Sequence, residues 1–115
     1  MEISYSFKKM GEFDQHFCRQ YFIPKAKMIE RALPKLSADA DVHLTFRAER
    51  FAKKKAFKVT LTLFADTHRW IAEEDDHTLR EAIDLAKDKL VLQMRKRHRV
   101  FGAVQGLPHQ EKVVA

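Results

Sequence analysis

The side chains best suited to bind a ligand in this sequence are positively charged and close together near residue 97. Arg95, Lys96, Arg97 and Arg99 place four cations in five positions, after the mixed-charge segment 84–94. Arginine offers a planar fork of donors that fits phosphate oxygens at two points. One or two cations are enough to stabilise the negative end of a helix. Four exceed that need, so the run predicts contact with phosphate groups of a polyanion.

A second basic segment is the short link at 52–58, with the sequence AKKKAFK. It contains Lys53, Lys54 and Lys55, and the wider range 47–58 holds six basic residues against the single acid Glu49. Lysines in a hairpin can simply prevent other molecules from pairing with a strand edge. They can equally contact a polyanion, and both interpretations stay open. With a net charge of +6, the uneven charge favours a nucleic acid or an anionic membrane as partner.

Other chemistry is poorly represented in the sequence. It contains no GxGxxG, GxxxxGK[ST] or GxSxG motif, and its six histidines have no metal-ligand spacing. The adjacent Glu73 and Glu74 are expected on opposite faces of a strand, which argues against a catalytic carboxylate pair. The lone Cys18 lies among aromatic residues and is expected to be a small buried side chain. We therefore expect a protein that is not an enzyme and uses neither metal nor cofactor.

The length of 115 residues suits one domain, expected at 1–100, followed by a short C-terminal tail at 101–115. The sequence has neither an apolar run of the roughly 18 residues needed to cross a membrane nor a signal-like N-terminus. A cytoplasmic protein without membrane contact is expected. The acidic run Glu-Glu-Asp-Asp at 73–76 balances part of the positive charge.

Three segments show the period-2 alternation of half-buried strands, at 3–8, 42–49 and 57–63, and a fourth, shorter strand is expected at 68–73. The last three are joined by short links and predict an antiparallel meander. Between the first two strands, Pro24 is expected to begin a helix at 24–33, because proline disrupts a helix interior. Residues 11–23 are either a preceding helical turn or an ordered loop.

The final helix is expected to begin at 76–78. Thr78 and Glu81 fit a capping box, and the acidic run suits the positive end of the helix dipole. Continuing the core-facing spacing reaches Arg97, so the helix should extend past the sheet. Leu85 and Leu92 point away from the core side, either toward the first helix or into solvent. The core-facing seam is Leu79, Ile83, Ala86, Leu90 and Met94.

These elements predict an α+β fold of order β-α-β-β-β-α, a four-stranded sheet with two helices packed on one face, as in double-stranded-RNA-binding domains. Because no helix-turn-helix or zinc-finger pattern is present, RNA is favoured over DNA.

The segment AIDLAKDKLVLQMRKRHR at 82–99 resembles the last helix of the ribosome hibernation promoting factor family, also called ribosome-associated inhibitor or sigma-54 modulation proteins. That helix typically reads AIDLAxDKLxxQLxKxK. Element order and length also agree over about residues 1–100. Val91 and Leu92 depart from the pattern, which usually has charged residues there. The matching residues are Ala82, Ile83, Asp84, Leu85, Ala86, Asp88, Lys89, Leu90, Gln93 and Lys96.

The resemblance implies a stress factor that binds small-subunit rRNA in the decoding channel, blocks mRNA and tRNA, and is monomeric off the ribosome. It assigns RNA contacts to Lys87, Lys89, Arg95, Lys96, Arg97 and Arg99. Secondary contacts are expected from Lys25, Lys27 and Arg31 in the first helix, and from Lys53, Lys54 and Lys55 in the link.

Two alternatives remain at the level of sequence. A double-stranded-RNA-binding-like domain shares the α-β-β-β-α order, although such domains carry lysines where this chain has its acidic run. A protein-interaction adaptor could use Leu85 and Leu92, with the basic residues serving solubility. A membrane-binding role is less favoured, because the segment 95–99 has no neighbouring apolar face.

Overall fold

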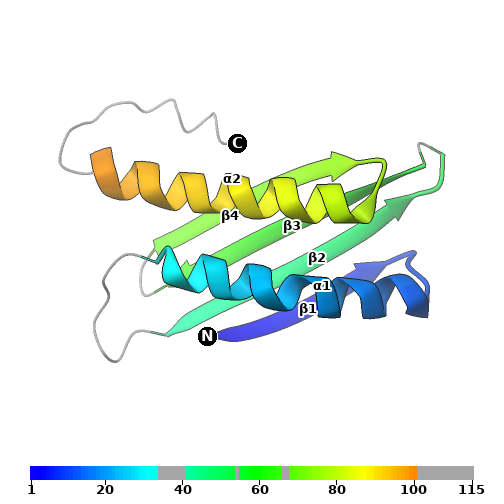
Figure 1. Ribbon diagram of the computed structural model, residues 1–115, viewed down its shortest axis with the longest axis horizontal. Helices are drawn as coiled ribbons and strands as arrows, with labels where there is room; N and C mark the ends of the chain where they lie inside the picture. Colours follow the sequence, from blue (N-terminus) through cyan, green and yellow to red (C-terminus); the bar gives the residue numbers. More distant parts are fainter. Residues whose placement is uncertain (34–40, 54, 66–67, 101–115) are drawn as a thin grey trace.

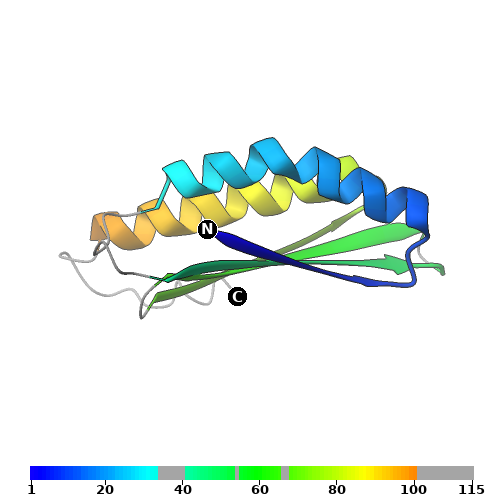
Figure 2. The same cartoon turned by 90° about the horizontal axis from the view of Figure 1, so that it is seen from below.

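Both helices cover one face of a four-stranded sheet and leave the other face open (Figure 1, Figure 2). The computed structural model describes residues 1–33, 41–53, 55–65 and 68–100, and for 97–100 the description covers the backbone. The predicted tail at 101–115 lies outside the described residues. The elements are β1 (Glu2–Lys8), α1 (Glu12–Arg31), β2 (Val42–Phe51), β3 (Ala56–Ala65), β4 (His68–Asp76) and α2 (Leu79–Val100).

The sheet has the strand order β1-β2-β3-β4, and its last three strands form the predicted antiparallel meander. β1 pairs with β2 in parallel, so that Tyr5 lies beside Phe46. Parallel neighbours need a crossover connection, and α1 supplies it. The predicted α+β class, the element order and the placement of both helices on one face are confirmed.

Alternating residues of the strands point toward the helices and form the core. Leu44 and Phe46 of β2 and Leu61 and Leu63 of β3 are fully buried. Their neighbours in the sequence face the open side of the sheet, as the period-2 pattern predicts. The predicted seam of α2 is confirmed, because all five of its side chains are buried: Leu79, Ile83, Ala86, Leu90 and Met94.

The prediction that Pro24 begins the first helix was wrong. α1 is one continuous helix of 20 residues, and Pro24 lies inside it. A proline there removes the backbone bond to the carbonyl of Gln20, but Gln20 and Pro24 are both on the solvent side, where water can replace that bond. The buried stripe Cys18, Phe22, Ala26 and Ile29 continues across the proline. Burial of this stripe outweighs the local cost of the proline.

The predicted strand at 68–73 extends further, because the whole acidic run Glu73–Asp76 belongs to β4, and α2 begins at Leu79, just after the predicted 76–78. The cap itself is formed by Thr78, whose Oγ1 accepts a hydrogen bond from the backbone N–H of Glu81 at 3.2 Å. The backbone N–H of Thr78 donates to Asp76 Oδ1 at 3.4 Å, so Asp76 takes the part expected of the Glu81 side chain in a capping box.

The C-terminal ends of α1 and α2 lie at the same end of the molecule (Figure 1). Both views show the last turns of α2 extending beyond the neighbouring ends of the strands, as predicted from the seam (Figure 1, Figure 2). The β2–β3 hairpin lies at the opposite end of the sheet (Figure 1). Neither helix, within the described residues, is long and apolar enough to cross a membrane.

Candidate nucleic-acid interface

Exposed cations gather at the end of the molecule where both helices finish. Arg31 lies in the last turn of α1, and Arg95 and Lys96 lie near the end of α2. All three side chains are exposed, and no ion pair joins Arg95 or Lys96 to another described residue. They are therefore available for an external anion. Arg97 and Arg99 continue the same helix, but their side chains lie outside the description.

Lys89, another predicted contact, is committed to the protein itself. Its Nζ lies 3.2 Å from Glu74 Oε2 and donates to the backbone carbonyl of Glu73 at 3.2 Å. One turn further along α2, Gln93 Nε2 donates to the carbonyl of Ile71 at 2.7 Å. Four helical residues rise about 6 Å, close to the advance of two strand residues, about 6.8 Å. This match lets the pair bind alternate carbonyls of β4, those of Ile71 and Glu73, on an edge strand.

Asp84 joins the two helices. Its carboxylate accepts hydrogen bonds from the Tyr21 hydroxyl at 2.8 and 3.0 Å and lies 3.1 Å from Lys25 Nζ. The hydrogen bond to Asp84 raises the pKa of Lys25. Burial, followed by the same carboxylate, raises the pKa of Tyr21. Lys25, a predicted secondary contact, is only 18% exposed and its ion pair with Asp84 joins α1 to α2. Lys27, another predicted secondary contact, lies on the exposed side of α1.

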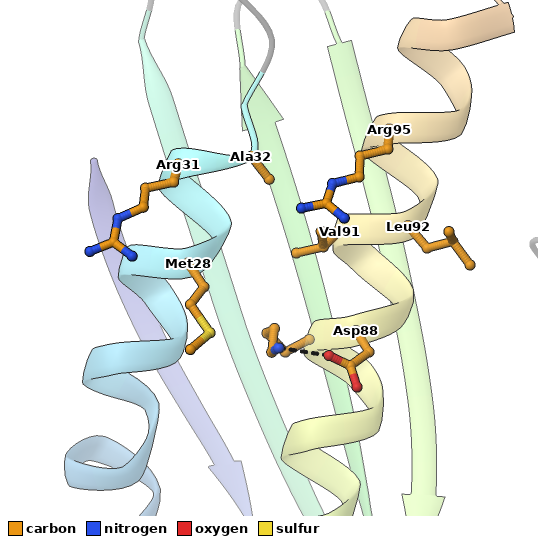
Figure 3. Close-up of a pocket in the computed structure, with 8 residues that line it drawn as sticks. Met28, Arg31, Ala32, Asp88, Val91, Leu92 and Arg95 are labelled. Carbon is orange, nitrogen blue, oxygen red and sulfur yellow. Dashed lines mark hydrogen bonds and ion pairs between the residues drawn. The ribbon is translucent and has the colours of Figure 1, made fainter.

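A groove of about 530 Å³ lies between α1 and α2 toward their C-terminal ends. Figure 3 shows Val91 of α2 pointing toward α1, Met28 running along α1, and Arg95 extending above Val91. Lys87, a predicted contact, is largely covered and bonded to Asp88 at 2.6 Å. The groove is lined by Met28, Arg31, Ala32, Lys87, Asp88, Val91, Leu92 and Arg95.

The predicted secondary contacts in the link between β2 and β3 are far from this groove. Lys53 and Lys55 are exposed at the hairpin, which lies at the other end of the sheet (Figure 1). Lys54 lies outside the described residues. Lys55 has a φ of 50°, in the left-handed region that non-glycine residues seldom occupy. The structure thus separates the two basic clusters that the sequence suggested.

The open face of the sheet carries charges of both signs. Lys58 Nζ lies 2.9 Å from Glu73 Oε2, and this hydrogen bond raises the pKa of Lys58. Lys8 lies 3.9 Å from Glu49 on the neighbouring strands. Glu73 and Glu74 point to opposite faces, as predicted, and each pairs with a lysine. The acidic run thus compensates lysines of the sheet and of α2, and leaves Arg95 and Lys96 unpaired among the described residues.

Other reactive groups form no site within the described residues. These residues contain no cluster of histidine, cysteine and carboxylate side chains able to hold a metal ion. Cys18 is fully buried, as predicted, and burial raises the pKa of its thiol to about 12. A protonated thiol without access to solvent is unreactive.

Several residues of this region were missed by sequence reasoning. Met28 and Val91 received no role, although Val91 was one of the two departures from the family pattern. Tyr21 was given no functional role either. Leu85 and Leu92 are 43% and 57% exposed, which decides between the two orientations that their spacing allowed. The one signal of the groove in the sequence was Val91, an apolar residue at a position that is usually charged in the family pattern.

Comparison with known proteins identifies a family. The sequence model described as "Sigma 54 modulation protein / S30EA ribosomal protein" matches residues 6–100. This match confirms the resemblance found in the final helix. A comparison with curated proteins finds no significant match.

Solved structures of two proteins share the fold. The N-terminal domain of Protein Y from Thermus thermophilus matches with a TM-score of 0.66 and 21% identity, covering 84% of this chain and 98% of that domain. A ribosomal subunit interface protein from Coxiella burnetii matches with a TM-score of 0.60 and 16% identity, covering 86% of this chain and 99% of that one.

Proposed function

Because the chain belongs to the Sigma 54 modulation protein / S30EA ribosomal protein family, we propose that it is a ribosome-associated hibernation factor. It binds rRNA of the small subunit in the decoding channel and blocks the binding of mRNA and tRNA. Its action is occlusion and involves no chemical step. It works in the cytoplasm and is monomeric when it is not bound to a ribosome.

The observation that carries this proposal is the group of exposed cations at the shared C-terminal end of the two helices. Arg31, Arg95 and Lys96 are exposed there, and for Arg95 and Lys96 no carboxylate partner exists among the described residues. Phosphate contacts of this kind supply affinity without reading base sequence. Structured RNA is recognised largely by shape and by such contacts. A similar solved structure is that of a ribosomal subunit interface protein from Coxiella burnetii, which supports the same partner.

The test is co-sedimentation of the protein with purified 30S and 50S subunits across a series of salt concentrations. Wild type should sediment with 30S subunits, and binding should weaken steeply with salt because phosphate contacts release counterions. Added mRNA and initiator tRNA should compete with it. Retention on 50S subunits alone, or no binding at about 100 mM salt, would contradict the proposal.

A pair of variants with the same net charge separates a local interface from general attraction. Arg95→Glu with Lys96→Glu reverses two charges at the helix end, and Lys53→Glu with Lys55→Glu reverses two at the distant hairpin. The first pair should weaken binding about 100-fold, given two lost charge-assisted contacts. The second should weaken it less than about fivefold if the hairpin only receives long-range attraction. Equal losses would show that net charge alone drives binding.

The double-stranded-RNA alternative gives a different result in the same assay. A protein of that kind should bind a free RNA duplex as tightly as it binds 30S subunits, because it recognises A-form shape. Preference for the 30S subunit over a duplex of about 16 base pairs favours the ribosome.

A further inference from the structure

The groove between α1 and α2 combines two surfaces that a single nucleotide requires. Its lining includes the apolar side chains of Met28, Ala32 and Val91, and Arg95 extends over it from α2 (Figure 3). Met28 is 43% exposed, and Arg31 borders the groove with its guanidinium directed away from α2 (Figure 3). An exposed apolar side chain near the guanidinium of Arg95 is suited to a ligand with a flat apolar part and an anionic part.

We propose that this groove holds one unstacked nucleotide of an RNA strand, and the proposal rests on the function proposed above. The base lies on Met28 and Val91, and the guanidinium of Arg95 covers its other side. Arg31, with Arg95, contacts the flanking phosphates. RNA-binding proteins commonly hold splayed bases against apolar side chains or guanidinium planes, and arginine fits phosphate oxygens at two points.

The dimensions of the groove agree with this ligand. Its volume of about 530 Å³ lies within the range of roughly 300–1,000 Å³ usual for sites that bind small organic groups. Lys87 and Asp88 form an ion pair at 2.6 Å within the lining, so the lysine charge there is largely compensated. The uncompensated charge over the groove therefore comes from Arg95, and Arg31 adds a second exposed guanidinium on the outer side of α1.

A partner helix fits the groove less well than a nucleotide. An amphipathic helix needs apolar anchors over two turns, at spacings i, i+3 or i+4 and i+7. The apolar lining here covers about one turn of each helix, at 28–32 and 91–92. Leu92 also points away from α1 in Figure 3, so it extends the rim and not the floor.

The experiment compares Met28→Ala with Ile23→Ala in binding to purified 30S subunits. Both residues are exposed apolar side chains of α1, at 43% and 48%, but Ile23 is outside the groove lining. Met28→Ala should weaken binding about 3- to 10-fold, near the low end of the loss for a base-stacking residue, and Ile23→Ala should leave it unchanged. Met28→Trp should bind at least as tightly as wild type. Urea denaturation verifies that each variant is folded.

The dependence on salt supplies a second readout. Met28→Ala removes no charge, so its slope of log affinity against log salt should equal that of wild type. Arg95→Gln removes one phosphate contact and should reduce the slope by about one.

Photo-crosslinking locates the contact. Benzoylphenylalanine introduced at position 28 should crosslink to 16S rRNA at one nucleotide, mapped by primer extension, and at position 23 it should not. A crosslink from position 28 to a ribosomal protein, or equal affinities of Met28→Ala and Ile23→Ala, overturns the nucleotide proposal and leaves ribosome binding intact. If millimolar AMP prevented this crosslink from forming, the groove would be assigned to free nucleotides, and the proposal of an RNA nucleotide would also be overturned. Absence of 30S binding by wild type instead rejects the proposed function itself.

Discussion

The first four or so turns of α2 and its last turns use similar polar side chains for different purposes. In the segment 79–93, Asp84, Lys89 and Gln93 are bonded to α1 or to β4. Beyond Met94, Arg95 and Lys96 are exposed and without an ion-pair partner among the described residues. Within the family motif at 82–99, Asp84, Lys89 and Gln93 thus hold the helix in place, whereas the exposed candidate binding residues Arg95 and Lys96 lie in its last part. A motif can identify a family through residues that fix its fold.

The largest effect on stability is expected from Asp84→Ala. It leaves the Tyr21 hydroxyl and Lys25 without their partner between the helices, so the free energy of unfolding should fall by about 1–2 kcal/mol. Urea denaturation measures this change. Asp88→Ala is the matched control, because Asp88 is 67% exposed and pairs with the adjacent Lys87, and its loss should stay below about 0.5 kcal/mol. Equal losses would show that Asp84 has no special role in joining the helices.

The same contact predicts a dependence on alkaline pH. Lys25 and Tyr21 both have raised pKa values in the folded protein. Raised values stabilise the protonated forms, so this stability is present below the ordinary pKa values, 10.0 for Tyr21 and 10.5 for Lys25, and is lost as pH rises above them. Wild type should therefore lose stability above about pH 10, and Asp84→Asn should lose less over that range. Identical pH profiles in urea denaturation would contradict the assignment.

A smaller effect is expected where α2 meets the edge of the sheet. Lys89→Ala combined with Gln93→Ala removes two side-chain bonds to carbonyls of β4, and the unfolding free energy should fall by about 1 kcal/mol. The uncovered edge should also increase self-association, detected by light scattering. Lys96→Ala should instead preserve stability and weaken 30S binding. The comparison between the two parts of α2 fails if Lys89→Ala weakens binding more than Lys96→Ala does.

The smallest effect concerns the distant hairpin. Lys55 has a φ of 50°, which glycine adopts without steric cost, so Lys55→Gly should raise the unfolding free energy by about 0.5 kcal/mol. Lys55→Ala removes the same charge and keeps the strained backbone, and it should give no gain. Thermal unfolding of the two variants measures the difference. Both should bind 30S subunits nearly as wild type does, because the hairpin lies away from the helix ends.

Local patterns in the sequence predicted much of this fold. The period-2 alternation predicted the strands, and the spacing from Leu79 to Met94 predicted the buried side of α2. These predictions succeed because alternation and helical spacing directly express which side chains leave water. The run of cations after Met94 was also visible, because the seam stops there.

The first helix shows where local reasoning fails. Pro24 lowers helix propensity, but the buried stripe from Cys18 to Ile29 crosses it. Propensity is a weak term compared with the burial of several side chains. The spacing of that stripe was present in the sequence, and it would have predicted a continuous helix had it been weighed above the proline.

The sequence alone determined the alternation of the strands, the buried side of α2, the family and the position of the basic run at the end of α2. The tertiary structure decided which groups within the protein each of these side chains contacts. Lys89 and Lys96 share a flank of α2 in sequence terms, yet Lys89 lies over the carbonyls of β4 and Lys96 is exposed beyond Met94. Met28 and Val91 line one groove because α1 and α2 pack side by side. A sequence pattern indicates on which side of its helix or strand a side chain lies. The atoms that this side chain contacts belong to elements distant in the chain, so they depend on the tertiary structure.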